Sequence, residues 1–167
     1  MTQYNLLAIL AATLVPLVMG FIWYNPKVLG TAWMSAAGLT EEKLKGANMA
    51  VIFLISLLFS FLLAFQIQYM VIHQFHYYSI LVGEKEFMDS KSGLWGSIND
   101  FMTAYGDRFR TFKHGAFHGF INALTVILPV LAINALFERK SWKYIWINWG
   151  YWAICFMIMG GIICAWR

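Results

Sequence analysis

Hydrophobic residues gather in four long runs along the chain, and polar segments separate the runs. The runs cover residues 5–24, 49–72, 115–137 and 144–166, and none of them contains a Lys, Arg, Asp or Glu. A helix needs about 20 apolar residues to cross the roughly 30 Å hydrocarbon core of a bilayer. The pattern therefore predicts an all-α membrane protein, with four transmembrane helices in a bundle and residues 1–167 in a single integral membrane domain.

The long second loop holds one further periodic segment. Between Leu94 and Tyr105 the apolar residues recur at the spacing of one helical face. This segment is too short and too polar to span a bilayer. It predicts an amphipathic helix at 94–105, which lies in the membrane interface or packs over the protein's own loops.

Composition and charge agree with a membrane location. The chain is 60% hydrophobic and only 12% charged, with a mean hydropathy of +0.63, whereas soluble domains are about 25% charged. The net charge of +4 does not indicate nucleic acid, because every Lys and Arg lies outside the four runs, where the flanking cations of membrane proteins sit. We therefore expect the lipid bilayer, and no nucleic acid, as the surroundings of this chain.

The polar residues of the second and third runs each recur at the spacing of one helical face. They are Gln66, Tyr69, His73 and His76 in the second run, and His114, His118, Asn122 and Thr125 in the third. Polar side chains are costly in lipid, so both stripes are expected to face protein or a water-filled interior. In an antiparallel pair of helices, the two stripes would lie side by side.

Small residues form a second pattern beside the histidines. Gly115, Gly119 and Ala123 recur four apart, and so do Gly161 and Ala165 in the last run. Such spacing lets two helices approach closely within a membrane. We expect these residues to be helix-packing surfaces, used with a second copy of the chain or with another membrane protein.

Two sequence blocks carry a family resemblance. The first is W-Y-N-P-K-V-L-G-T-A-W-M from Trp23 to Met34. The second is L-F-E-R-K-S-W-K-Y-I-W-I-N-W-G-Y-W from Leu136 to Trp152, followed by M-G-G-I-I-C-A-W up to Trp166. With these blocks, the chain resembles the DUF1761 family of unknown function over essentially its whole length. The resemblance implies a small, mostly bacterial, four-helix integral membrane protein, and it brings no reaction, cofactor or catalytic residue.

The location that follows is the bacterial inner membrane, crossed several times. Six Lys and Arg lie on the side of the termini and the second loop, and six lie on the opposite side. Cations in short loops weigh more than those in long loops in setting orientation. We therefore expect both termini to lie outside the cytoplasm.

Three functions remain open at this point. No motif of a hydrolase, nucleotide-binding or dinucleotide-binding enzyme occurs in the chain, so we predict no catalytic residue and favour a non-enzymatic role. The first hypothesis is a membrane protein that acts through helix packing with itself or with a partner. The second is a small transporter or channel with a His/Asn/Gln-lined polar path between the second and third helices.

The third hypothesis is a metal site. His73, His76, His114 and His118 would supply neutral imidazoles, which suit zinc, copper or nickel. Histidines spaced three or four apart place two rings on one face of a helix. We predict no cofactor from the sequence, and a divalent transition metal is the one alternative that these histidines leave open.

Overall fold

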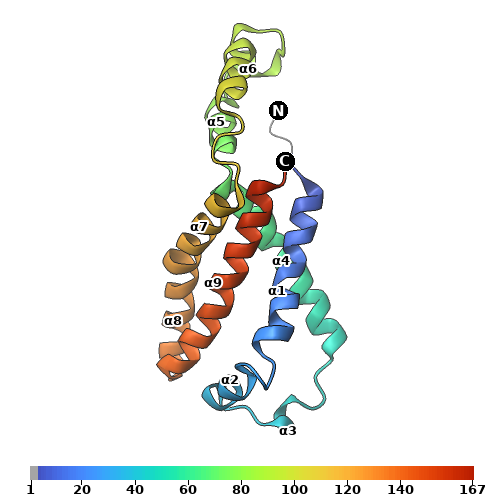
Figure 1. The fold of residues 1–167 in the computed structure, drawn as a ribbon, viewed down its shortest axis with the longest axis vertical. Helices are drawn as coiled ribbons and strands as arrows, with labels where there is room; N and C mark the ends of the chain where they lie inside the picture. The colour runs from blue at the N-terminus through green and yellow to red at the C-terminus, as the bar shows by residue number, and fades with distance from the viewer. Residues whose placement is uncertain (1–3) are drawn as a thin grey trace.

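Four long helices form the body of the computed structural model, which describes residues 4–167 (Figure 1). They are α1 (Leu6–Trp23), α4 (Met49–Val71), a third helix made of α7 (Phe112–Asn122), η2 (Ala123–Ile127) and α8 (Leu128–Phe137), and α9 (Trp142–Ala165). All four are long and apolar enough to cross a membrane, and the described part of the chain contains no strand. The predicted all-α class with four such helices is confirmed.

Helix α9 lies at the centre of the body, because α1, α4 and α7 all pack against it. Its buried residues include Cys155 and Met159, which join side chains of α1 and α4 in one apolar core. Two hydrogen bonds tie α9 to α1. The indole N–H of Trp23 donates to the carbonyl of Ile147 over 3.0 Å, and the Tyr151 hydroxyl donates to the carbonyl of Pro16 over 2.7 Å.

The small residues of α7 provide the closest approach between two helices. A Cβ atom on Gly115 would overlap the carbonyl oxygen of Gly160, and one on Gly119 would overlap the carbonyl oxygen of Phe156. Ala123 is fully buried. The sequence pattern therefore identifies a real packing face, but α9 of the same chain occupies it.

The expectation for the small residues of α9 needs the same correction. Gly161 lies beneath the ring of Phe112, whereas Ala165 is exposed near the end of α9. Since the glycines are covered within the chain, they are not available to a second copy or to another membrane protein. The glycine surfaces that we expected to contact a partner thus pack within the chain, and Ala165 alone stays exposed.

The third long helix changes its winding in the middle. Pro129 has no N–H to donate to the carbonyl four residues earlier, so regular α-helical bonding cannot continue through it. Residues Ala123–Ile127 form a π-helical turn just before it, a common response to such a break. The carbonyl of Ala123 accepts the backbone N–H of Leu128 and also the indole N–H of Trp149 over 2.9 Å, which ties the bulge to α9.

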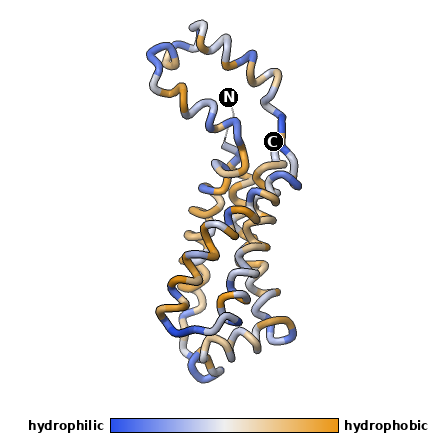
Figure 2. The backbone as a smooth tube through the Cα atoms, turned by 90° about the vertical axis from the view of Figure 1, so that its left-hand side faces the viewer, coloured by the Kyte–Doolittle hydropathy of each residue, from blue (hydrophilic) through white to orange (hydrophobic). Residues whose placement is uncertain are grey.

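Shorter helices lie at both ends of the body. Helices α2 (Gly30–Ala37) and α3 (Glu41–Leu44) connect α1 to α4 at one end. At the other end α5 (Gln74–Leu81), η1 (Lys85–Met88) and α6 (Gly93–Tyr105) form an arm that projects beyond the four long helices (Figure 1). Hydrophobic residues dominate the long helices, and hydrophilic residues are concentrated in the arm and the connections (Figure 2).

Helix α6 covers the segment expected at 94–105. Its apolar side packs against α5. The rings of Tyr77 and Phe101 stack at 4.1 Å between centroids, Tyr78 lies against Trp95, and Ile98 is fully buried. These contacts cover part of the apolar stripe within the arm, whereas Tyr105 stays exposed. The choice between the two arrangements stays a prediction.

Candidate functional site

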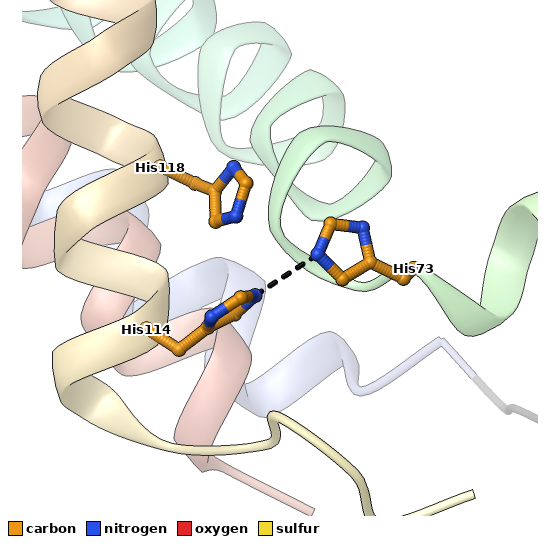
Figure 3. Close-up of side chains that lie close together, drawn as sticks. All are labelled: His73, His114 and His118. Atoms are coloured by element: carbon orange, nitrogen blue, oxygen red, sulfur yellow. Dashed lines mark hydrogen bonds between the residues drawn. The ribbon is translucent and has the colours of Figure 1, made fainter. Parts of the chain in front are cut away.

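Three of the four histidines converge where α4 and α7 approach the arm. His114 and His118 lie one turn apart on α7, and His73 lies at the break between α4 and α5 (Figure 3). The Nε2 atoms of His73 and His114 are 3.0 Å apart. One ring nitrogen from each of the three lies within 4.8 Å of the others.

The start of α7 fixes two of these rings. Thr111 precedes the helix, and its hydroxyl accepts a hydrogen bond from the backbone N–H of His114 over 3.2 Å, a typical N-cap. Residues four apart on the helix then point to the same side. Because Gly115 and Gly119 turn the neighbouring face of α7 toward α9, the two histidines are directed toward the end of α4.

His73 reaches the cluster because the chain turns at the end of α4. The helix ends at Val71, and Ile72 has extended backbone angles (φ −110°, ψ 94°). Both residues are buried, whereas His73 is exposed. The next residue, Gln74, donates from its side-chain amide to the carbonyls of Tyr105 and Arg108 over 3.1 and 3.0 Å, which fixes α5 to the returning chain of the arm.

Phe109 covers the cluster from the side of the arm. Its ring stacks on His114 at 5.0 Å between centroids and 19° between planes, and meets His73 edge-on at 6.3 Å. Its φ of 65° is in the left-handed region, which costs a bulky residue about 1–2 kcal/mol. The surrounding contacts therefore hold Phe109 in a backbone conformation that a bulky residue disfavours.

Those contacts come from the end of α9. The thiol of Cys164 donates to the carbonyl of Phe109 over 3.3 Å. The guanidinium of Arg110 donates to the carbonyls of Cys164 and Trp166 over 2.8 and 3.2 Å. The segment that carries Phe109 is thus tied to the helix that also packs against α7.

The protonation state of His73 favours metal binding. Although His73 is exposed, the partial loss of hydration on the covered side of its ring lowers the pKa of this imidazole below its ordinary value, and the nearby His118 and His76 add to the shift. The ring is therefore neutral at pH 7, with a lone pair available to a metal ion. Among residues 4–167, only the three histidines contribute ligand atoms to the group; Asp107, in the adjacent loop, pairs instead with Arg167 at 3.2 Å.

The spacing of the rings is close to that of a metal site. Zinc–nitrogen bonds of about 2.0–2.1 Å at tetrahedral angles place two ligand nitrogens about 3.3 Å apart. The 3.0 Å between His73 and His114 is a hydrogen-bond contact between the two rings, and it is also near that value; the ligand atoms of the whole group lie within 4.8 Å of one another. Three imidazoles around one ion leave a fourth position for water or another ligand.

His76 is not part of the cluster. It lies on α5 with its side chain exposed, and the group of three excludes it. The residues from Gln66 to His76 do not lie on one continuous helix, because the helix breaks at Ile72. The two ends of that stripe therefore point in different directions. Gln66 itself is exposed on α4 and does not face the interior expected for it.

The remaining residues of the two stripes bond locally. Asn122 donates to the carbonyl of His118 over 2.9 Å, and Thr125 donates to that of Ile121 over 2.8 Å. The hydroxyl of Tyr69 bonds that of Tyr4 at 2.8 Å. Asn122 and Thr125 are thus satisfied within their own helix, and Tyr69 by the segment before α1. Of the polar stripe residues, only the histidines at the end of α4 and on α7 face one another across the two helices.

Two residues near the site lie outside the sequence-based expectations. Gln68 is 1% exposed, and its amide nitrogen has no partner among the described residues. The only sequence feature that could have predicted its burial is its position two residues after Gln66. A helix turns by about 200° over two residues, so the two glutamines lie on opposite sides of α4. Phe109 carries no sequence signal, because its role depends on a backbone conformation.

Comparison with known proteins identifies one family. The family model described as "Protein of unknown function (DUF1761)" matches residues 7–164, a range that includes all three clustered histidines. No curated protein and no solved structure matches the chain.

Proposed function

The chain belongs to the DUF1761 family of proteins of unknown function, and we propose that it is a multi-pass membrane protein that binds a transition-metal ion. The single observation that carries the proposal is the convergence of His73, His114 and His118, with their ring nitrogens within 4.8 Å of one another. Zinc, copper and nickel are the ions that such a group of neutral imidazoles suits.

The membrane part of the proposal is supported by the outer faces of the four helices. Large apolar side chains such as Phe21, Leu54 and Val130 are exposed there, and water would oppose such a surface. The proposed location is the bacterial inner membrane with both termini outside the cytoplasm. The metal site, at the end of the molecule where α1 begins and α9 ends, then faces the extracytoplasmic side.

The site suits reversible binding better than a purely structural role. Structural zinc sites are closed by four protein ligands, whereas sites with three keep a position for an exchangeable ligand. His73 is exposed and the other two rings are half-buried, so an ion can enter from the aqueous side. The proposal is therefore binding and exchange of a metal ion at the membrane surface, without a reaction catalysed by the chain.

Metal content tests this proposal. The wild-type protein and the His114→Ala variant are purified in detergent, loaded with zinc and washed with a weak chelator, and zinc is then counted per chain. We expect one ion per wild-type chain and none in His114→Ala. His76→Ala, which removes a histidine outside the cluster, is the matched control and should retain its zinc. A wild-type protein without zinc, or equal losses in both variants, would contradict the proposal.

A further inference from the structure

A cleft lies between α1, α4 and α9, and it extends from Ser60 in the middle of α4 to Pro26 and Met49 at the end of the molecule opposite the histidines. Its volume is about 710 Å³, within the range of small-molecule sites. Phe21, Trp33 and Phe53 line it, together with Ser56, Ser60 and Trp152. Phe21 and Phe53 are also exposed on the outer surface, so the cleft opens sideways, toward the hydrocarbon of a surrounding membrane.

The inner wall of this cleft carries a hydroxyl group without a partner. Ser60 is 3% exposed, and its hydroxyl bonds to no residue that the structure describes. Thr13 and Thr125, on other long helices, instead donate to carbonyls of their own helices over 2.8 Å each. Ser60 lines the cleft, so its hydroxyl, which can both donate and accept, is free to bond a partner there.

Two further polar groups line the same space. The Ser56 hydroxyl, one turn before Ser60, and the indole N–H of Trp152 on α9 also bond to none of the residues at 4–167. Both residues line the cleft. An indole nitrogen only donates, and a hydroxyl can donate, so the three groups together favour a ligand that carries a hydrogen-bond acceptor.

Depth in the membrane selects the kind of acceptor. Ser60 follows Met49, the first residue of α4, by eleven positions, which corresponds to about 16 Å along the helix. That is roughly half of the 30 Å hydrocarbon core. Phospholipid ester groups lie near the edges of this core, and acyl chains carry no acceptor. The depth of Ser60 therefore favours a lipid-soluble molecule that carries an oxygen acceptor on an otherwise apolar body.

We propose that this cleft binds a lipid-soluble carbonyl compound of the quinone type. Its carbonyl oxygen accepts hydrogen bonds from Ser60 and Trp152, and its flat ring lies among the aromatic side chains, where Phe21 and Phe53 are 5.6 Å apart between centroids. This inference rests on the membrane location in the proposed function, and it is independent of the metal site.

Quenching of tryptophan fluorescence tests the site, with decyl-benzoquinone as the probe and the full-length protein in lipid nanodiscs. We expect saturable quenching in the wild-type protein and a roughly three- to tenfold weaker affinity in Ser60→Ala, as the loss of one hydrogen bond predicts. Thr125→Val, which removes a hydroxyl already satisfied by its own helix, is the matched control and should bind like the wild type. Ser56→Leu, which fills the cleft with apolar atoms, should abolish saturable quenching.

Three results would overturn the inference. The first is quenching that never saturates in the wild-type protein. The second is equal affinity in Ser60→Ala and Thr125→Val, and the third is full competition by decylbenzene, which has the same tail without carbonyls. Circular dichroism of each variant confirms its helix content, and zinc counted on the same samples reports the metal site separately, so failure of one proposal does not imply failure of the other.

Discussion

The Nε2 atoms of His73 and His114 lie 3.0 Å apart although 41 residues separate the two in the chain. The whole arm, from α5 to the segment that carries Phe109, lies between them in sequence. Each ring is held by a different set of contacts: His114 by the packing of α7 on α9, and His73 by the bonds of Gln74 to the returning chain. Substitutions in either set of contacts should therefore change zinc binding, even where none of the three histidines is replaced.

The α7–α9 contact gives the first prediction. Gly119→Ala places a methyl group against the carbonyl oxygen of Phe156, and overpacking of this kind costs about 1–3 kcal/mol. We expect a lower thermal unfolding temperature and weaker retention of zinc, because α7 moves away from its place. Gly96→Ala in α6, where an added Cβ has no atom within 4 Å, is the control and should be neutral or slightly stabilising. Equal unfolding temperatures for the two variants would contradict the prediction.

The ring of Phe109 gives the second prediction. Phe109→Asn removes the ring that covers His114 and replaces it with a residue that tolerates the left-handed conformation. We expect the fold to persist and zinc to be extracted faster by EDTA, measured as a rate after loading. Phe109→Tyr keeps the ring and should release zinc at the wild-type rate. Identical rates for all three proteins would show that Phe109 does not control access to the site.

A comparison of Gln74 in α5 with Gln66 in α4 gives a third prediction. Gln74→Leu removes the side-chain bonds to the carbonyls of Tyr105 and Arg108. The Tyr105 carbonyl keeps its bond from the backbone N–H of Arg108, whereas the Arg108 carbonyl loses its donor, which costs about 1–3 kcal/mol where the group is buried. We expect faster backbone hydrogen exchange in residues 105–110 and weaker zinc binding. Gln66→Leu, a change of the same size on the exposed face of α4, should leave both unchanged. If exchange at 105–110 were equal in the two variants, Gln74 would not be what fixes the arm.

Orientation in the membrane gives a fourth prediction. The native cysteines Cys155 and Cys164 are fully buried, so new cysteines can report on each side. In intact cells, a membrane-impermeant maleimide should label Ser97→Cys on the arm and should leave Thr40→Cys unlabelled until the cells are lysed. The reverse pattern would place both termini in the cytoplasm.

The sequence predicts the four long helices well because their signal is local: each is an uncharged apolar run of sufficient length. It also places His114 and His118 on one face, since a spacing of four within a regular helix fixes their relation. His76 is different. No proline or glycine at Ile72 predicts the helix break. A prediction that continues the helix past Ile72 therefore places His76 on the wrong face.

Contacts between helices are harder to predict from the sequence than the helices themselves. The spacing of Gly115 and Gly119 indicates a close helix contact, but it does not say whether the partner helix belongs to the same chain. That choice depends on the whole arrangement around α9. The left-handed backbone at Phe109 is also held by hydrogen bonds between residues 109–110 and the end of α9. A local sequence pattern cannot predict these long-range bonds.

The coordination of a bound ion tests the central claim most directly. X-ray absorption spectroscopy of the zinc-loaded wild-type protein should show scattering from three imidazole rings with zinc–nitrogen distances of about 2.0–2.1 Å, together with one further light atom. In His118→Ala the imidazole contribution should fall or the zinc should be lost, while His76→Ala should give the wild-type spectrum. Zinc without imidazole scattering, or a spectrum that is unchanged in His118→Ala, would contradict the assignment of His73, His114 and His118 as a metal site.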